Sequence, residues 1–213
     1  MNRNINQERR PGRPPVSDEG ASRAQILATA ERLFSEKGYS ATSLRHIGEA
    51  AGLNPALVGY HFGNKLGLLE AVFTEALEPL ANALQQLREA DSAPVAELLR
   101  LVQRLAVEHP QMLPLLVREA LLPGGAMRDV FADRFAPRLG GLFPALLRRE
   151  QQHGALDPDA DPEALTVLLL SMGIFPHVAA GLAERVIGLD MRDGGAERLM
   201  TQTRRLLKRG AGP

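Results

Sequence analysis

The sequence predicts an all-helical protein with a small N-terminal helical domain and a larger helical body. Apolar residues recur at intervals of three and four along almost the whole chain, while alternating runs of Thr, Val and aromatic residues, which are typical of strands, are absent. The 213 residues fit one large domain, or a small domain fused to a middle-sized one. The 45% hydrophobic and 23% charged content is that of a folded protein and argues against global disorder.

Composition also limits the chemistry that the chain can perform. The absence of cysteine excludes disulfides, iron–sulfur clusters, thiolate zinc sites and cysteine nucleophiles. The first residues lack the apolar core of a signal peptide, and we expect a cytoplasmic protein. The balance of 25 Lys and Arg against 25 Asp and Glu argues, at face value, against a nucleic-acid partner. It hides a weak split, since residues 1–70 have a small positive excess and residues 71–213 a small negative one.

The N-terminus is predicted to be a basic arm followed by a helix. Closely spaced prolines predict that the first twenty residues are not helical, and we assign residues 1–21 to a flexible arm. The first helix is indicated by an apolar stripe and is expected to end at Lys37 and Gly38. The stripe consists of Ile26, Leu27, Ala30, Leu33 and Phe34.

Residues 42–62 predict two short helices joined by a tight turn. Thr42 is expected to be the N-cap of the first helix. Gly52-Leu53-Asn54 forms the turn, and Asn54 with Pro55 is expected to open the second helix, over about 55–62. This is the helix-turn-helix arrangement, whose second helix enters the DNA major groove. A purely structural helix pair in a bundle has the same pattern.

Residues 42–69 (TSLRHIGEAAGLNPALVGYHFGNKLGLL) resemble the DNA-binding domain of the tetracycline-repressor (TetR) family. Residues 26–34 and 37–42 also match that family's first helix and link, so the resemblance covers about residues 22–75. It implies a three-helix DNA-binding domain of the helix-turn-helix type over residues 22–82. It further implies a helical regulatory domain, responsible for ligand binding and dimerisation, over residues 83–213.

The resemblance also implies which residues contact DNA. At the start of the first motif helix, a phosphate would be held by Thr42, Ser43 and Arg45. Base edges would be read by the exposed face of the second helix, at Asn54, Pro55, Ala56, Leu57 and Gly59. The sugar–phosphate backbone would be contacted by Tyr60 and His61 at the end of the second helix and by Lys65 after it.

Three of these positions invite a specific interpretation. Leu57 stands where the family commonly has Thr or Ser, and it offers an apolar contact to a thymine methyl group. Gly59 stands where Tyr is common, and a glycine inside a helix indicates close approach of the backbone to DNA. Lys65 lies at the positive end of a helix dipole, which a DNA phosphate would compensate.

The arm contains a second candidate DNA contact. Arg10-Pro-Gly-Arg13-Pro resembles the core of AT-hook segments, whose arginines lie in a narrow minor groove. We therefore expect Arg10 and Arg13 to add affinity on A·T-rich flanks. A tail with a few chance arginines is the alternative.

The body is predicted to consist of helices over 95–107 and 112–122, a divided segment over 127–153, and helices over 163–185 and 196–208. Residues 164–183 carry no formal charge and have membrane-spanning length. Thr166, Ser171, Pro176 and His177 disfavour a membrane span, so we expect burial against the body's core and a second subunit. The resemblance implies a homodimer in which this helix and the last one form a four-helix bundle with their mates.

The resemblance implies an apolar ligand cavity between residues 95 and 180. Candidate polar groups are His109, Arg118, Glu119, Arg134 and His177. Candidate walls are Met112, Met127, Phe131, Phe135, Phe143, Met172 and Phe175, for which ordinary core packing is the alternative. The effector itself is not indicated by the sequence.

No catalytic motif stands out. The five histidines lack metal-binding spacing, and neither a nucleophile elbow nor a phosphate-binding glycine loop is present, so we expect no cofactor, no metal and no enzymatic activity. The sequence predicts a dimeric repressor that a small, largely apolar ligand releases from double-stranded operator DNA. A regulator without an inducer, an activator, and a helical small-molecule-binding protein with vestigial DNA binding are the alternatives.

Overall fold

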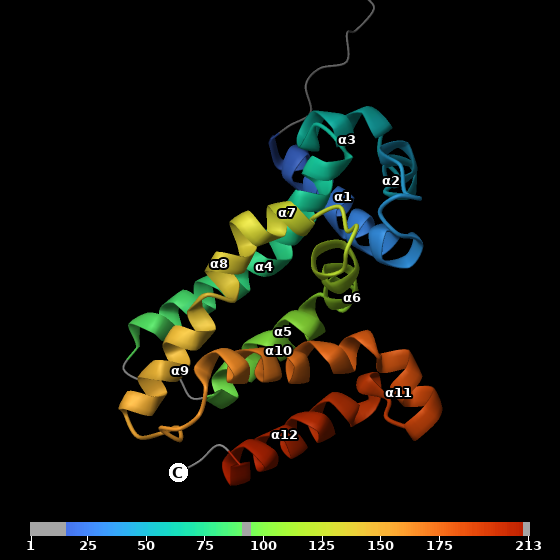
Figure 1. The fold of residues 1–213 in the computed structure, drawn as a ribbon. Coiled ribbons are helices and arrows are strands. Elements are labelled where there is room, and N and C mark those ends of the chain that lie inside the picture. The colour runs from blue at the N-terminus through green and yellow to red at the C-terminus, as the bar shows by residue number, and fades with distance from the viewer. Residues whose placement is uncertain (1–15, 91–94, 211–213) are drawn as a thin grey trace, which may run out of the picture.

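The computed structural model describes residues 16–90 and 95–210, and every regular element in these ranges is helical, as predicted (Figure 1). The first elements are α1 (Val16–Lys37), α2 (Leu44–Ala50), α3 (Pro55–Phe62) and α4 (Lys65–Glu89). They are followed by α5 (Val95–Glu108), α6 (Met112–Leu116), the π-helical turn η1 (Val117–Leu121), α7 (Arg128–Val130), the π-helical turn η2 (Phe131–Phe135), α8 (Ala136–Leu139) and α9 (Leu142–Gln152). The last are α10 (Pro162–Val178), α11 (Ala180–Ile187), η3 (Met191–Gly195) and α12 (Ala196–Gly210).

Helices α1–α3 and the N-terminal half of α4 form a compact unit at one end of the molecule, which we call the head (Figure 1). The predicted stripe on α1 is buried, and the predicted glycine end of that helix is present because Gly38 has a positive φ of 89°. Helix α4 runs out of the head into the remaining helices, which we call the body. Pro79 does not end it, since α4 continues to Glu89.

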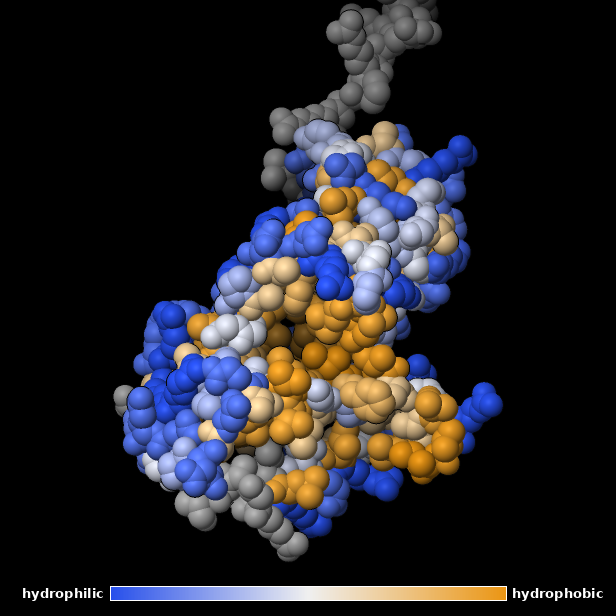
Figure 2. Space-filling model, viewed as in Figure 1, coloured by the Kyte–Doolittle hydropathy of each residue, from blue (hydrophilic) through white to orange (hydrophobic). Residues whose placement is uncertain are grey.

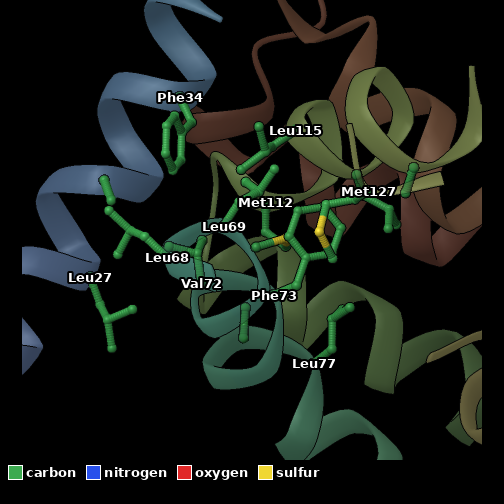
Figure 3. Close-up of a cluster of buried hydrophobic side chains, with 14 of the residues drawn as sticks. Leu27, Phe34, Leu68, Leu69, Val72, Phe73, Leu77, Met112, Leu115 and Met127 are labelled. Carbon is green, nitrogen blue, oxygen red and sulfur yellow. The ribbon is translucent and has the colours of Figure 1, made fainter. Parts of the chain in front are cut away.

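One apolar core joins the head to the body. Phe34 of α1, Leu68 and Phe73 of α4 and Met112 of α6 point toward one another in Figure 3 and belong to a single cluster of buried side chains. A second cluster lies between the far half of α4 and helices α5, α9 and α10. Here α10 approaches α5 so closely that a Cβ atom on Gly173 would lie 2.7 Å from Val102 Cγ1. The shared core therefore fixes the body directly against α1.

Two predictions about the head are corrected. Helix α1 begins at Val16, so residues 16–20 are helical although we expected a non-helical arm; the closely spaced prolines end at Pro15, and nothing after them interrupts the helix. The N-cap of α2 is Ser43, whose side chain accepts a hydrogen bond from His46 N (3.1 Å), and not Thr42. The Thr42 hydroxyl is buried and donates to Gly38 O (2.8 Å).

One prediction about the body is also corrected. The helix expected over 163–185 is two helices, α10 and α11, which meet at Ala179 and are bent by 73°. Pro176 lies inside α10 and does not end it; the break falls three residues later, at Ala179, where the backbone leaves helical geometry (φ −91°, ψ 7°). In the described part of the chain, no single helix has both the length and the apolar character to cross a membrane; α10 and α11 meet the test only as this bent pair.

Candidate DNA-reading face and ligand cavity

Helices α2 and α3 are held in a tight pair by local chemistry. Asn54 caps α3 as predicted, since its Oδ1 accepts a hydrogen bond from Ala56 N (3.0 Å), and Pro55 occupies the first turn. Gly48 of α2 allows the two helices to cross closely, because a Cβ atom there would lie 2.6 Å from Pro55 Cα. The orientation of α3 therefore depends on its N-cap and on this glycine.

The predicted DNA-contacting residues over 54–61 divide into an exposed and a half-buried group. Asn54, Ala56 and Tyr60 are exposed, and Tyr60 is 67% accessible. The remaining predicted residues of α3 (Pro55, Leu57, Gly59 and His61) are half-buried, and Leu57 also packs against the apolar core. Gly59 has no packing reason to be glycine, because a Cβ atom there would meet nothing within 4 Å.

The residues at the start of α2 divide into exposed and buried groups. Ser43 and Arg45 are exposed, and Arg45 Nε donates to Glu49 Oε1 one turn later (2.8 Å). Thr42 is only 1% exposed, so its hydroxyl closes the link between α1 and α2 and does not face solvent. The candidate minor-groove residues Arg10 and Arg13 lie outside the described residues.

Lys65 has partners within the protein. Its Nζ donates to Tyr39 O (3.0 Å) and Ser40 O (3.4 Å), and it lies 4.3 Å from the centroid of the Tyr39 ring. These carbonyl oxygens compensate the ammonium at the N-terminus of α4. The dipole argument for a phosphate at this position is therefore unnecessary, although Lys65 remains at the edge of the head beside α3.

The body contains an apolar cavity of about 670 Å³, a volume typical of small-molecule sites. Figure 2 shows a hollow surrounded by hydrophobic surface at the centre of this face. Ser171 contributes the one polar side chain to the described lining, and its hydroxyl donates to Val167 O (2.7 Å). The lining residues are Leu77, Leu80, Val102, Leu105, Leu113, Leu116, Val117, Leu121, Phe131, Ala136, Leu139, Gly140, Phe143, Val167, Leu170, Ser171, Ile174, Phe175 and Val178.

Three of the predicted wall residues, Phe131, Phe143 and Phe175, line this cavity. The others belong to the packed interior. Met112 and Met127 are fully buried in the core shared with the head, and Met172 packs against the second cluster. Phe135 lies behind Phe131, with the two rings stacked at a centroid separation of 5.9 Å. Ordinary core packing, the alternative left open by the sequence, accounts for these four residues.

The predicted polar groups do not line the cavity. His109 pairs with Glu31 of α1 (Nδ1 to Oε2, 3.1 Å), and Arg134 pairs with Glu70 of α4 (2.7 Å). His177 Nε2 lies 3.1 Å from the side-chain oxygen of Gln103, and burial lowers the pKa of this histidine. Arg118 and Glu119 turn away from the cavity toward α1. Each group is satisfied elsewhere, which explains why the cavity wall is almost purely apolar.

The lining residues of α10 that the sequence analysis did not name lie on one helical face with the predicted Phe175. They are Val167, Leu170, Ser171, Ile174 and Val178, and with Phe175 they recur at spacings of three and one. The spacing was available in the sequence, but it does not distinguish a face packed against a cavity from a face packed against solid core.

Comparison with known proteins decides the family. Residues 26–72 match "Bacterial regulatory proteins, tetR family", and residues 92–210 match "Tetracyclin repressor-like, C-terminal domain". The chain belongs to the TetR family of transcriptional regulators. The sequence resemblance is thus confirmed, and the second match extends it over most of the body.

Individual TetR-family proteins support this assignment over nearly the whole length. The HTH-type transcriptional regulator RutR of Escherichia coli (strain K12) is 30% identical over 179 residues, which cover 81% of this chain and 82% of RutR. The structure of NalD, the secondary repressor of the MexAB-OprM multidrug efflux pump in Pseudomonas aeruginosa, has 26% identity and a TM-score of 0.66 and covers 92% of this chain and 98% of NalD. A SmeT–triclosan complex has the same fold, with 22% identity and a TM-score of 0.62 over 85% of this chain and 91% of SmeT.

The C-terminal helices of this TetR-family chain carry an exposed apolar face. Figure 2 shows hydrophobic surface over the region where α10 meets α11. Large apolar side chains are rarely gathered at the surface without a partner. Those exposed on α10–α12 are Val167, Leu168, Phe175, Val178, Leu182, Val186, Ile187 and Leu206.

Proposed function

We propose that this TetR-family regulator is a homodimeric repressor, that α3 reads its operator, and that an uncharged, largely apolar molecule in the cavity releases it from DNA. The observation that carries the proposal is an exposed α3 face in the same chain as a large cavity whose lining turn η1 is hydrogen-bonded to α1 through Arg118. The first feature fits the major groove and the second fits a small ligand.

The DNA-facing part of the proposal assigns four roles. Asn54, Ala56, Leu57 and Gly59 approach base edges, whereas Ser43, Arg45, Tyr60, His61 and Lys65 contact the backbone. Pro55 sets the start of α3, and Thr42 supports α2 from inside. Arg10 and Arg13 reach the minor groove beside the site. Since its partner is genomic DNA, we assign the protein to the cytoplasm and expect no catalytic activity.

The ligand-facing part assigns a charge to the ligand as well as a polarity. A carboxylate or ammonium group in this cavity would lose its water and find no oppositely charged side chain in the described lining, which is strongly unfavourable. The nearby Arg134 and Arg138 are paired with Glu70 and Glu78 of α4. An uncharged molecule avoids this cost. The SmeT complex, which has the same fold, holds triclosan.

The dimer part rests on the exposed apolar face of α10–α12. We propose that it packs against the same face of a second copy, so that two α3 helices meet successive major grooves about one helical turn apart. Leu168→Glu places a charge on this face without altering the cavity lining and is expected to give a monomer in analytical ultracentrifugation. Val107→Glu, at an apolar residue of α5 that is even more exposed than Leu168, is the control and should remain dimeric. A dimeric Leu168→Glu protein would contradict this interface.

The central experiment measures DNA binding and ligand response together. An operator is selected from random-sequence DNA, and its dissociation constant is measured by fluorescence anisotropy with and without N-phenyl-1-naphthylamine, an uncharged apolar dye. We expect the dye to bind and to weaken operator binding. Failure of the folded dimer to select any DNA at low salt would favour a small-molecule-binding protein with vestigial DNA binding.

A variant that fills the cavity locates the ligand. Ala136→Trp adds a large side chain at the cavity wall, on α8 and away from the exposed face of α10, and should abolish dye binding while leaving operator binding intact. Ala136→Ser, which only adds a hydroxyl, is the matched control and should still bind the dye. Equal dye binding by all three proteins would show that the ligand site lies elsewhere.

A further inference from the structure

Three elements both line the cavity and contact the head. The short helix α6 contributes Leu113 and Leu116 to the wall and packs against α1. Helix α4 contributes Leu77 and Leu80 to the wall and begins in the head at Lys65. The turn η1 contributes Val117 and Leu121 to the wall, and its intervening residues Arg118 and Glu119 face α1. Of the three, η1 is the element whose side chain donates hydrogen bonds to the backbone of α1, through Arg118.

Arg118 binds the C-terminal end of α1. Its Nη1 donates to Ser35 O (3.0 Å), its Nη2 donates to Phe34 O, and its Nε donates to Glu119 Oε1 (2.9 Å). The last carbonyls of a helix lack partners in that helix and carry its negative dipole end, so a guanidinium is a strong ligand for them. Two nitrogen atoms of the guanidinium thus join the body to α1, and the third binds Glu119 within η1.

Glu119 extends this connection across the link between α1 and α2. Its carboxylate is buried; Oε1 accepts from Tyr39 N (3.5 Å) and Oε2 from Ala126 N (3.3 Å). Tyr39 is also held from the opposite side, where Lys65 donates to its carbonyl oxygen. The short segment that positions α2 therefore lies between η1 and α4.

The backbone of η1 is a wide turn. Leu122 N donates to Val117 O (3.0 Å), five residues back in the chain, where an α-helix would bond four residues back. Such π-helical turns occur mostly as single turns and often at functional sites. The turn places apolar residues on the cavity side and the Arg118–Glu119 pair on the α1 side.

We propose that Arg118 is the positioning residue that couples the cavity to the DNA-reading helices. A molecule in the cavity displaces Val117 and Leu121, η1 shifts, and the Arg118 guanidinium moves the end of α1 and, through it, α2 and α3. The ligand acts because it binds the protein with η1 shifted more tightly than the protein with η1 in its original position. This inference rests on the proposed function, since it explains how ligand and operator exclude one another.

The test measures coupling, not affinity alone. Coupling is the ratio of the operator dissociation constants with and without saturating N-phenyl-1-naphthylamine, and such ratios are typically about 5 to 150. In Arg118→Met, which keeps an unbranched apolar side chain of similar length, the dye should bind as in the wild type and the ratio should fall at least about fivefold. A merely structural role would change thermal stability or operator affinity and leave the ratio unchanged.

Two further variants make the test specific. Arg138→Met removes the ion pair between α8 at the cavity wall and Glu78 of α4 (2.8 Å) without touching α1, and it should keep the wild-type ratio. Arg118→Lys retains the charge but not the fork of donors. If Arg118→Met does not fold as a dimer, the lysine variant decides the matter, with an expected fall in the ratio of at least about threefold.

The outcomes separate the inference from the function on which it rests. A wild-type protein that binds the dye but keeps its operator affinity overturns the proposed function and, with it, the coupling. A responsive wild type together with an equally responsive, folded Arg118 variant overturns the inference alone, and the signal then travels by a route other than η1. A reduced ratio in the Arg118 variant with a normal ratio in Arg138→Met supports the proposal.

Discussion

Gly59 provides a test in which protein stability and DNA affinity should change in opposite directions. The substitution Gly59→Ala adds one methyl group to α3. Within the described protein this methyl meets nothing within 4 Å, and Gly59 lies inside a helix, so the folded state accepts alanine without strain. The helix gains about 0.8–1 kcal/mol from the better propensity of alanine.

That gain translates into a measurable shift. For a protein of this size, about 1 kcal/mol raises the melting temperature by roughly 2–4 °C. If the α3 backbone approaches DNA at Gly59, the same methyl overpacks the interface, and a cost of about 1–3 kcal/mol weakens operator binding roughly five- to 150-fold. The melting temperature is measured by circular dichroism at 222 nm and the operator dissociation constant by fluorescence anisotropy.

A matched control is present in the same motif. In Gly48→Ala the new methyl group would lie 2.6 Å from Pro55 Cα, so α2 and α3 must move apart and both stability and operator affinity should fall. The reasoning about Gly59 fails if Gly59→Ala melts higher and binds the operator as tightly as the wild type. In that case the backbone of α3 does not approach DNA at this position.

Four further predictions follow from other parts of the molecule. Lys65→Met removes two hydrogen bonds from Nζ to carbonyl oxygens, so the free energy of unfolding in urea should fall by about 1 kcal/mol, and binding to all DNA sequences should weaken alike; an altered base preference would contradict a backbone role. Leu57→Ala should instead alter the base preference in a selection experiment, by about 1 kcal/mol at one base pair. Deletion of residues 1–15 should weaken operator binding and reduce the slope of log affinity against log salt by about one unit for each contacting arginine, and an unchanged slope would exclude the arm from the interface. Because burial lowers the pKa of His177, the unfolded chain takes up a proton at higher pH than the folded protein, so stability should fall as the pH drops below about 6.5; His177→Gln should lose less stability than the wild type between pH 7.5 and pH 5.5 in urea titrations.

The head was largely predictable from sequence because its signals are local. Asn54 and Pro55 specify the start of α3 through contacts within two residues, and Gly38 specifies the end of α1 through its own backbone conformation. Thr42 and Ser43 were harder to separate, since both are good N-caps. The choice between them depends on Thr42 reaching the carbonyl of Gly38, a contact made only once α1 and α2 have met.

The cavity was predicted less well because its wall depends on tertiary packing. Arg118 and His109 were reasonable ligand contacts in sequence, yet their partners are Ser35 and Glu31, more than seventy residues away. Such pairs leave no local pattern. Phe131 and Phe135 show the same limit, since they lie on one π-helical turn and only Phe131 reaches the cavity.

Helix α10 connects the two proposed activities of the body. Its residues Val167, Phe175 and Val178 line the cavity and also belong to the exposed apolar face, and Phe175 remains 69% accessible in the single chain. A ligand that pushes on Phe175 from inside therefore alters a surface that we propose packs against the second subunit. The position of the second α3 helix depends on that packing, so the same ligand affects the operator complex by two routes. The Arg118 variant removes the route through η1 and leaves this one, so a ligand response that survives in it measures what the dimer face and the packing of α4 and α6 against the head contribute together.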